Sequence, residues 1–144
     1  MRFLTLILFF SSFFLAHSQK QTHTTNPIYL GTILIDDVSE KSMAETCLFY
    51  QLTEAADEDG YKVFISKDGT KVRFKFEEDS KNAKPVVEVI TKEKDSAIKK
   101  ILSQTGYHKA NDGYIRGSQF SNTLTRCVLS NSQPKTLLFK KVNK

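Results

Sequence analysis

The chain has 144 residues and a formal net charge of +5, from 21 Lys and Arg against 16 Asp and Glu. The positive excess is mild, and the sequence has no Arg-rich stripe and no Trp. These features argue against nucleic acid as a partner and support only a weak preference for anionic partners. The length that follows the first eighteen residues suits one domain with a hydrophobic core of its own.

The first eighteen residues carry the signals of export. Arg2 supplies a positive start, a mainly apolar run extends from Phe3 to Leu15, and Ala16-His17-Ser18 places small residues where a signal peptidase cuts. The run is too short for a comfortable membrane span. We therefore expect a signal peptide (residues 1–18) that is cleaved, and a secreted or periplasmic mature chain without a transmembrane segment. The polar residues 19–27 predict a flexible leader.

Residues 28–144 are predicted to form a single α+β domain. The segment 28–38 is rich in β-branched and aromatic residues and predicts a strand. A helix capped by Ser39 or Ser42 should follow to about Ala55, because apolar residues recur there at the three-to-four spacing of one helical face. The acidic sequence 57–60 then predicts a turn.

The clearest local signal is a β-hairpin. Two strand-like runs, Tyr61–Ile65 and Lys71–Phe76, flank Asp68-Gly69, which supplies the positive φ of a tight turn. Apolar and basic side chains alternate strictly along the second run, so one of its faces is apolar and the other is basic. The basic side chains are those of Lys71, Arg73 and Lys75.

The C-terminal half predicts one further helix and four further strands. The helix should be capped by Asp95 or Ser96 and run to about Thr105, and Gly106 is suited to end it in the left-handed conformation. The strands are expected at 86–90, 114–117, 124–130 and 136–142, with a turn at 131–134 between the last two.

These elements predict an antiparallel sheet with two helices packed on one face. The halves 28–80 and 84–144 resemble each other, and Asp59-Gly60-Tyr61 matches Asp112-Gly113-Tyr114 when one loop deletion is allowed. This indicates a duplicated β-α-β-β unit. The alternative is that two unrelated units share the same helix-cap and turn chemistry.

The two cysteines, Cys47 and Cys127, are both predicted to be buried. Cys47 lies on the apolar face of the first expected helix, and Cys127 alternates in phase with Leu129 on an expected strand. In an oxidising compartment this placement predicts a Cys47–Cys127 disulfide. Two separate buried thiols are the alternative.

No motif indicates a catalytic, metal or cofactor site. Zinc-ligand spacings, a nucleophile elbow and phosphate or dinucleotide loops are missing from the sequence. The acids Asp57 and Asp59 fit only the middle of a calcium loop, because Ala55 and Ser66 occupy its ends. An enzyme would have to use His108 with a nearby acid such as Asp112.

The remaining candidate site is the basic face of the hairpin. Lys71, Arg73 and Lys75, with Tyr61 and Tyr114 after the two matching turns, predict a surface that holds a protein or anionic envelope material. The competing interpretation is an ordinary solvated sheet face. We therefore expect a secreted or periplasmic, non-enzymatic binding module without a cofactor. A small hydrolase-like enzyme and a structural envelope component are the alternatives.

Overall fold

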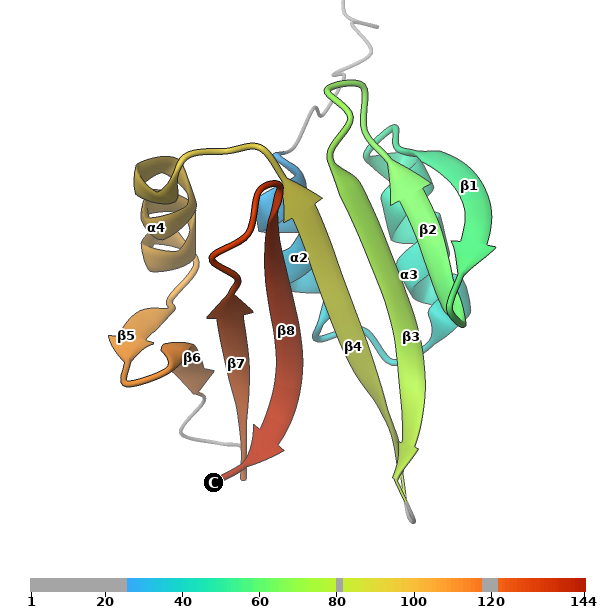
Figure 1. The fold of residues 1–144 in the computed structure, drawn as a ribbon. Coiled ribbons are helices and arrows are strands. Elements are labelled where there is room, and N and C mark those ends of the chain that lie inside the picture. Colours follow the sequence, from blue (N-terminus) through green and yellow to red (C-terminus); the bar gives the residue numbers. More distant parts are fainter. Residues whose placement is uncertain (1–25, 80–81, 118–121) are drawn as a thin grey trace, which may run out of the picture.

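A computed structural model of the chain describes residues 26–79, 82–117 and 122–144. Within these residues the protein has an α+β fold, in which one sheet of eight antiparallel strands accompanies three helices (Figure 1). The sequence predicted this class but one helix fewer. The signal segment and most of the leader lie outside the described residues. No helix in the described part of the chain combines the length and apolar character needed to cross a membrane.

The helices are α2 (Pro27–Leu34), α3 (Glu40–Phe49) and α4 (Asp95–Gln104). The strands of the first half are β1 (Thr53–Glu58), β2 (Tyr61–Ile65), β3 (Lys71–Asp79) and β4 (Asn82–Thr91). Those of the second half are β5 (His108–Ala110), β6 (Gly113–Gly117), β7 (Thr123–Leu129) and β8 (Lys135–Asn143). Their order across the sheet is β1-β2-β3-β4-β8-β7-β6-β5.

Helix α2 corrects the strand predicted over residues 28–38. The side chain of Asn26 accepts a hydrogen bond from the Ile28 amide at 2.9 Å, and Pro27 is the first helical residue. The helix is apolar on most sides because it packs between the sheet and the other helices, so no polar stripe marks its period. At Gly31 an added Cβ would lie 2.6 Å from Val89 Cγ2, which shows how closely α2 approaches the sheet.

Helix α3 is shorter than predicted. It ends at Phe49, and Gln51 follows with a φ of 64°. The residues that the sequence assigned to the helix end and an acidic turn form β1, and the turn itself is confined to Asp59 and Gly60, both with positive φ. The apolar residues Leu52 and Ala55 continue the three-to-four spacing beyond Phe49, although neither of them lies in the helix.

The remaining elements confirm most of the sequence predictions. The hairpin of β2 and β3 pairs as expected, and α4 is followed by Gly106 with a φ of 86°. The predicted cap of α4 was wrong, because Lys94 is the N-cap and makes no side-chain capping bond, while Asp95 and Ser96 already lie inside the helix. Strands β6, β7 and β8 lie where predicted. Strand β5 was missed because three residues are too few to show a period.

The order of elements differs from the predicted β-α-β-β unit. Helix α3 precedes one antiparallel meander, β1 to β4, and helix α4 precedes another, β5 to β8; the two meanders meet where β4 pairs with β8, and α2 precedes both. The matching triplets Asp59-Gly60-Tyr61 and Asp112-Gly113-Tyr114 lie at the equivalent turns, between β1 and β2 and between β5 and β6. The predicted unit fails because its first strand is helix α2.

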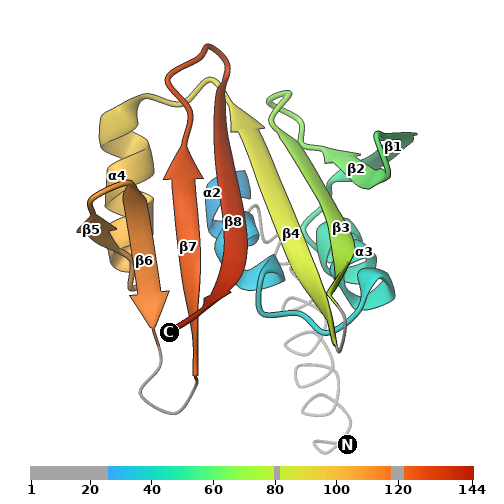
Figure 2. The ribbon, with the colours of Figure 1, turned by 60° about the horizontal axis from the view of Figure 1, so that its bottom comes forward.

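The sheet has a core face and an outer face. Figure 2 shows the strands of the sheet side by side, with β8 between β7 and β4. The core face carries buried side chains that belong to one cluster with those of α2, α3 and α4. On the central strands these are Val72, Phe74, Val87, Val89, Leu137 and Phe139. The outer face carries the alternate residues, among them Arg73, Lys75, Val86, Glu88, Leu138, Lys140, Arg126 and Val128.

Candidate functional site

The structure brings four of the five predicted binding residues together. Lys71, Arg73 and Lys75 project from the outer face of β3, and Tyr61 of β2 lies beside them. Tyr114 lies elsewhere, because it pairs with Cys127 on the core face. Tyr61 is the first residue of β2, whereas Tyr114 is the second residue of β6, and a one-residue shift reverses the face.

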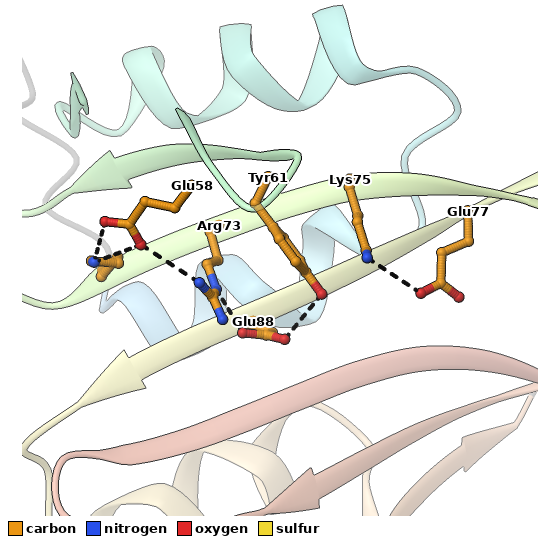
Figure 3. Close-up of polar contacts among 7 residues, drawn as sticks. Glu58, Tyr61, Arg73, Lys75, Glu77 and Glu88 are labelled. Atoms are coloured by element: carbon orange, nitrogen blue, oxygen red, sulfur yellow. Dashed lines mark hydrogen bonds and ion pairs between the residues drawn. The ribbon is translucent and has the colours of Figure 1, made fainter. Parts of the chain in front are cut away.

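Tyr61 is held between two cations (Figure 3). The guanidinium carbon of Arg73 and the Nζ of Lys75 each lie 4.6 Å from the centre of its ring. Its hydroxyl donates a hydrogen bond to Glu88 at 3.1 Å. Burial, with the nearby Glu88 charge, raises the pKa of Tyr61 to about 12. The ring is therefore covered, and only 8% of the residue is exposed.

Carboxylates on the flanking strands β1 and β4 neutralise the first two cations of β3 (Figure 3). Lys71 donates to both oxygens of Glu58 at 2.7 and 2.9 Å. Arg73 donates its Nε hydrogen to Glu88 at 2.7 Å, with its Nη1 3.5 Å from Glu58. The hydrogen bond from Lys71 lowers the pKa of Glu58. An anionic ligand at Lys71 or Arg73 would compete with these carboxylates.

The positive charge is less balanced further along the outer face. Lys75 and Lys140 share one carboxylate, that of Glu77, at 3.7 and 3.5 Å. Lys140 stands directly opposite Arg126 in the register of β7 and β8. Arg126 forms an exposed ion pair with Asp112 at 2.9 Å. Like charges in directly opposed positions destabilise a sheet, so this pair is unusual.

We name Lys75, Lys140 and Arg126 the cationic row. Their side chains are 31%, 42% and 42% exposed, and the register aligns them across β3, β4, β8 and β7 with Val86 in the gap. Neither Lys140 nor Arg126 was predicted from the sequence as part of a binding surface. Both belong to strands that were predicted, but the register that places them beside Lys75 joins residues more than fifty positions apart.

Apolar side chains adjoin the cationic row on the same face. Val128 is 38% exposed and pairs with the partly buried Leu138. Ile115 pairs with Arg126 and is also partly buried. The outer face of the second meander thus mixes apolar groups with cations, a composition typical of protein interfaces.

The residues of the alternative enzyme do not meet. His108 is exposed on β5, and no hydrogen bond or ion pair joins it to Asp112, which binds Arg126. In residues 26–79, 82–117 and 122–144 no group of three His, Cys, Asp or Glu side chains is arranged to hold a metal ion.

The predicted disulfide is not formed. Cys47 and Cys127 are free thiols, both fully buried in the core. Helix α3 packs against β1 and β3, whereas β7 lies three strands from β3, about 14 Å at the usual strand spacing. A disulfide requires Cα atoms within about 7 Å. Burial raises the pKa of both thiols to about 12, to which the charge of Asp37 contributes at Cys47.

Comparison with protein-family models, with curated proteins and with solved structures finds no match to this chain.

A hollow of about 610 Å³ lies between the β2–β3 turn, the loop from β4 to α4, and Pro134. None of the three residues of the cationic row lines it. Its two buried hydroxyls, of Thr70 and Thr91, lie 3.5 Å apart, and Thr91 also accepts a hydrogen bond from the Glu93 amide. These groups bond to the protein itself.

Proposed function

We propose that this chain is an exported, non-enzymatic binding module whose outer face binds an acidic patch on another protein. The observation that carries the proposal is the direct opposition of Lys140 and Arg126 across β7 and β8. Such a pair destabilises the free sheet by roughly 0.2–1 kcal/mol. A carboxylate from a partner would remove that repulsion on binding. The signal-like first eighteen residues support export.

The fold supplies a reason for the outer face to be accessible. We assign all three helices to the core face, since their buried side chains belong to the same cluster as Phe74 and Phe139. We also assign the two halves to one duplicated unit, a helix followed by a four-stranded meander. Under this assignment the outer face spans both repeats and is left for a partner.

An acidic protein fits this face better than a glycan does. Glycan sites on open sheets usually offer an exposed aromatic platform, and the ring of Tyr61 is covered by Arg73 and Lys75. Val128 and Leu138 instead offer aliphatic surface beside the cations. Aliphatic side chains next to positive charges suit a partner that presents both apolar and acidic side chains.

Charge reversal tests the proposal. The probe is a fluorescein-labelled peptide of repeated Glu-Glu-Leu, whose binding is followed by fluorescence anisotropy. We expect Lys140→Glu combined with Arg126→Glu to weaken binding by about tenfold or more, and added salt to weaken binding to the parent protein. The matched control is Lys99→Glu with Lys100→Glu, which reverses two exposed charges on α4.

The control should bind the peptide within about twofold of the parent. Equal loss in both double variants would show that only net charge matters and would overturn the assignment to the outer face. Binding of heparin, but not of the peptide, would instead identify an anionic polysaccharide as the partner and would contradict the protein proposal.

A further inference from the structure

Two carboxylates of the chain itself occupy the cationic row. Glu77 follows Lys75 by two positions on β3, so both side chains lie on the outer face. Its carboxylate is 3.7 Å from the Nζ of Lys75 and 3.5 Å from that of Lys140. Asp112, in the turn between β5 and β6, accepts a hydrogen bond from Nη1 of Arg126 at 2.9 Å. Each cation of the row thus has a counter-ion from the same molecule.

The counter-ion Glu77 is held loosely. Its two distances lie at or beyond the limit of a hydrogen bond, and one carboxylate serves two ammonium groups. By contrast, Lys71 donates to both oxygens of Glu58 at 2.7 and 2.9 Å. The side chain of Glu77 is also 47% exposed, so water screens its attraction to the lysines. Exchange of Glu77 for another carboxylate therefore costs little.

The second counter-ion, Asp112, is positioned by the backbone but satisfies Arg126 only in part. Gly113, the next residue, lies so near β7 that an added Cβ would be 2.4 Å from the Cys127 carbonyl oxygen. This close approach brings the turn beside Arg126. Asp112 accepts from Nη1, whereas the Nε of Arg126 is buried and has no hydrogen-bond partner within the described part of the chain. Asp112 is a well-exposed side chain, so its ion pair is also screened.

We infer that Glu77 and Asp112 are built-in competitors for the cationic row, which the acidic groups of a partner displace. This inference rests on the proposed function, because it describes how the outer face is regulated before a partner binds. In the free protein the two carboxylates reduce the repulsion between Lys140 and Arg126. When a partner supplies carboxylates of its own, Glu77 and Asp112 lose their cations and repel the bound acid.

The inference gives a sign that a simple supporting role would not give. An acid that supports a binding site weakens binding when it is neutralised, whereas a competitor strengthens it. Exposed ion pairs are weak, so we expect Asp112→Asn and Glu77→Gln each to tighten binding of an acidic ligand by about two- to fivefold. Both substitutions keep the size and shape of the side chain, and both sites are exposed, so the fold should be unchanged.

Fluorescence anisotropy with the fluorescein-labelled Glu-Glu-Leu peptide provides the measurement. The matched control is Glu45→Gln with Glu54→Gln, which removes two exposed carboxylates from α3 and β1. It changes the net charge as much as Asp112→Asn with Glu77→Gln does. We expect the control to bind the peptide within about twofold of the parent and the Asp112, Glu77 double variant to bind more tightly than either single variant.

A double-mutant cycle with Arg126→Gln separates local competition from a general gain of positive charge. Without the guanidinium, Asp112 has no cation to release, so Asp112→Asn should then change affinity by less than about twofold. An equal gain with and without Arg126, an equal gain in the control, or weaker binding after neutralisation of either acid would overturn the inference.

Failure of the inference is distinct from failure of the proposed function. If the parent binds the peptide, and Lys140→Glu with Arg126→Glu abolishes that binding, the proposed function stands whatever the neutral variants do. Unchanged affinity in Asp112→Asn and Glu77→Gln would then remove the inference alone. If neither the parent nor the Asp112, Glu77 double variant binds the peptide, both are overturned.

Discussion

The two meanders place basic side chains on the outer face in contrasting ways. In the first, Lys71 pairs with Glu58 of β1 and Arg73 pairs with Glu88 of the adjacent strand β4, so their charge is balanced inside the protein. In the second, Arg126 stands directly opposite Lys140. In the first meander the basic residues are therefore balanced by Glu58 and Glu88, whereas in the second two cations face each other across β7 and β8.

In the first meander the paired charges therefore stabilise the fold. Glu88 lies between Arg73 and Tyr61 and has a side chain only 13% exposed, so its bonds form in a partly desolvated place. Asp112, the acid that serves Arg126, is 66% exposed. Ion pairs of exposed side chains contribute little to stability, and their partners can be exchanged easily.

The largest expected difference in the free energy of unfolding is between glycine substitutions at the equivalent turns of the two meanders. Gly113 has a φ of 146°, and an added Cβ would lie 2.4 Å from the Cys127 carbonyl oxygen. Gly60 has a φ of 80° with no atom within 4 Å of such a Cβ. We expect Gly113→Ala to lower the free energy of unfolding by about 3 kcal/mol or more, and Gly60→Ala by about 1 kcal/mol.

Urea denaturation followed by circular dichroism measures both changes. Because backbone carbonyl oxygen cannot rotate away as a side chain can, the second meander must shift to accept Gly113→Ala. Equal losses in the two variants would show that the turns are strained alike and that β6 does not approach β7 as closely as described.

The next largest difference in stability is expected between substitutions of the carboxylates that bind Arg73 and Arg126. Replacing Glu88 by Ala leaves the Arg73 guanidinium and the Tyr61 hydroxyl without a carboxylate in a partly buried site. We expect a loss of about 2–3 kcal/mol. Asp112→Ala removes an exposed ion pair and should change stability by about 1 kcal/mol or less. Thermal and urea unfolding of both variants provide the measurement, and a larger loss for Asp112→Ala would reverse the comparison.

Local signals predicted those parts of the fold that local chemistry determines. Asp68-Gly69 and strict alternation specified the β2–β3 hairpin, and the apolar stripe and Gly106 specified α4. The candidate site was predicted only in part. Lys75 was identified on its strand, but its neighbours Lys140 and Arg126 come from strands paired through β4, and no local pattern records that pairing.

The errors have equally specific causes. Helix α2 was predicted as a strand because its position between the sheet and the other helices favours apolar residues on most sides, and burial of this kind erases the helical period. Tyr114 was assigned to the binding face because its turn matches that of Tyr61, but strand phase rather than turn sequence sets the face.

The smallest difference in stability between the halves is expected at the cysteines, one of which lies in each half. With no cross-link between them, Cys47→Ala and Cys127→Ala should each lower the free energy of unfolding by about 1–2 kcal/mol, the effect of a small cavity. The losses should add in the double variant, because the sites lie three or more strands apart. A disulfide would instead make either single substitution cost nearly as much as both, and titration in denaturant would then find no thiol where we expect two per chain.

Burial of the same thiols predicts that the free energy of unfolding falls at alkaline pH. Their pKa is about 12 in the folded protein against 9.0 for an ordinary thiol, so between these values the unfolded chain loses protons that the folded chain keeps. The free energy of unfolding should therefore be unaffected by the thiols below about pH 9 and fall as the pH rises above it. Tyr61 adds a similar fall from about pH 10. Urea midpoints measured across this range should fall less steeply for the double Cys→Ala variant, and an unchanged slope would show that the thiols are not buried as described.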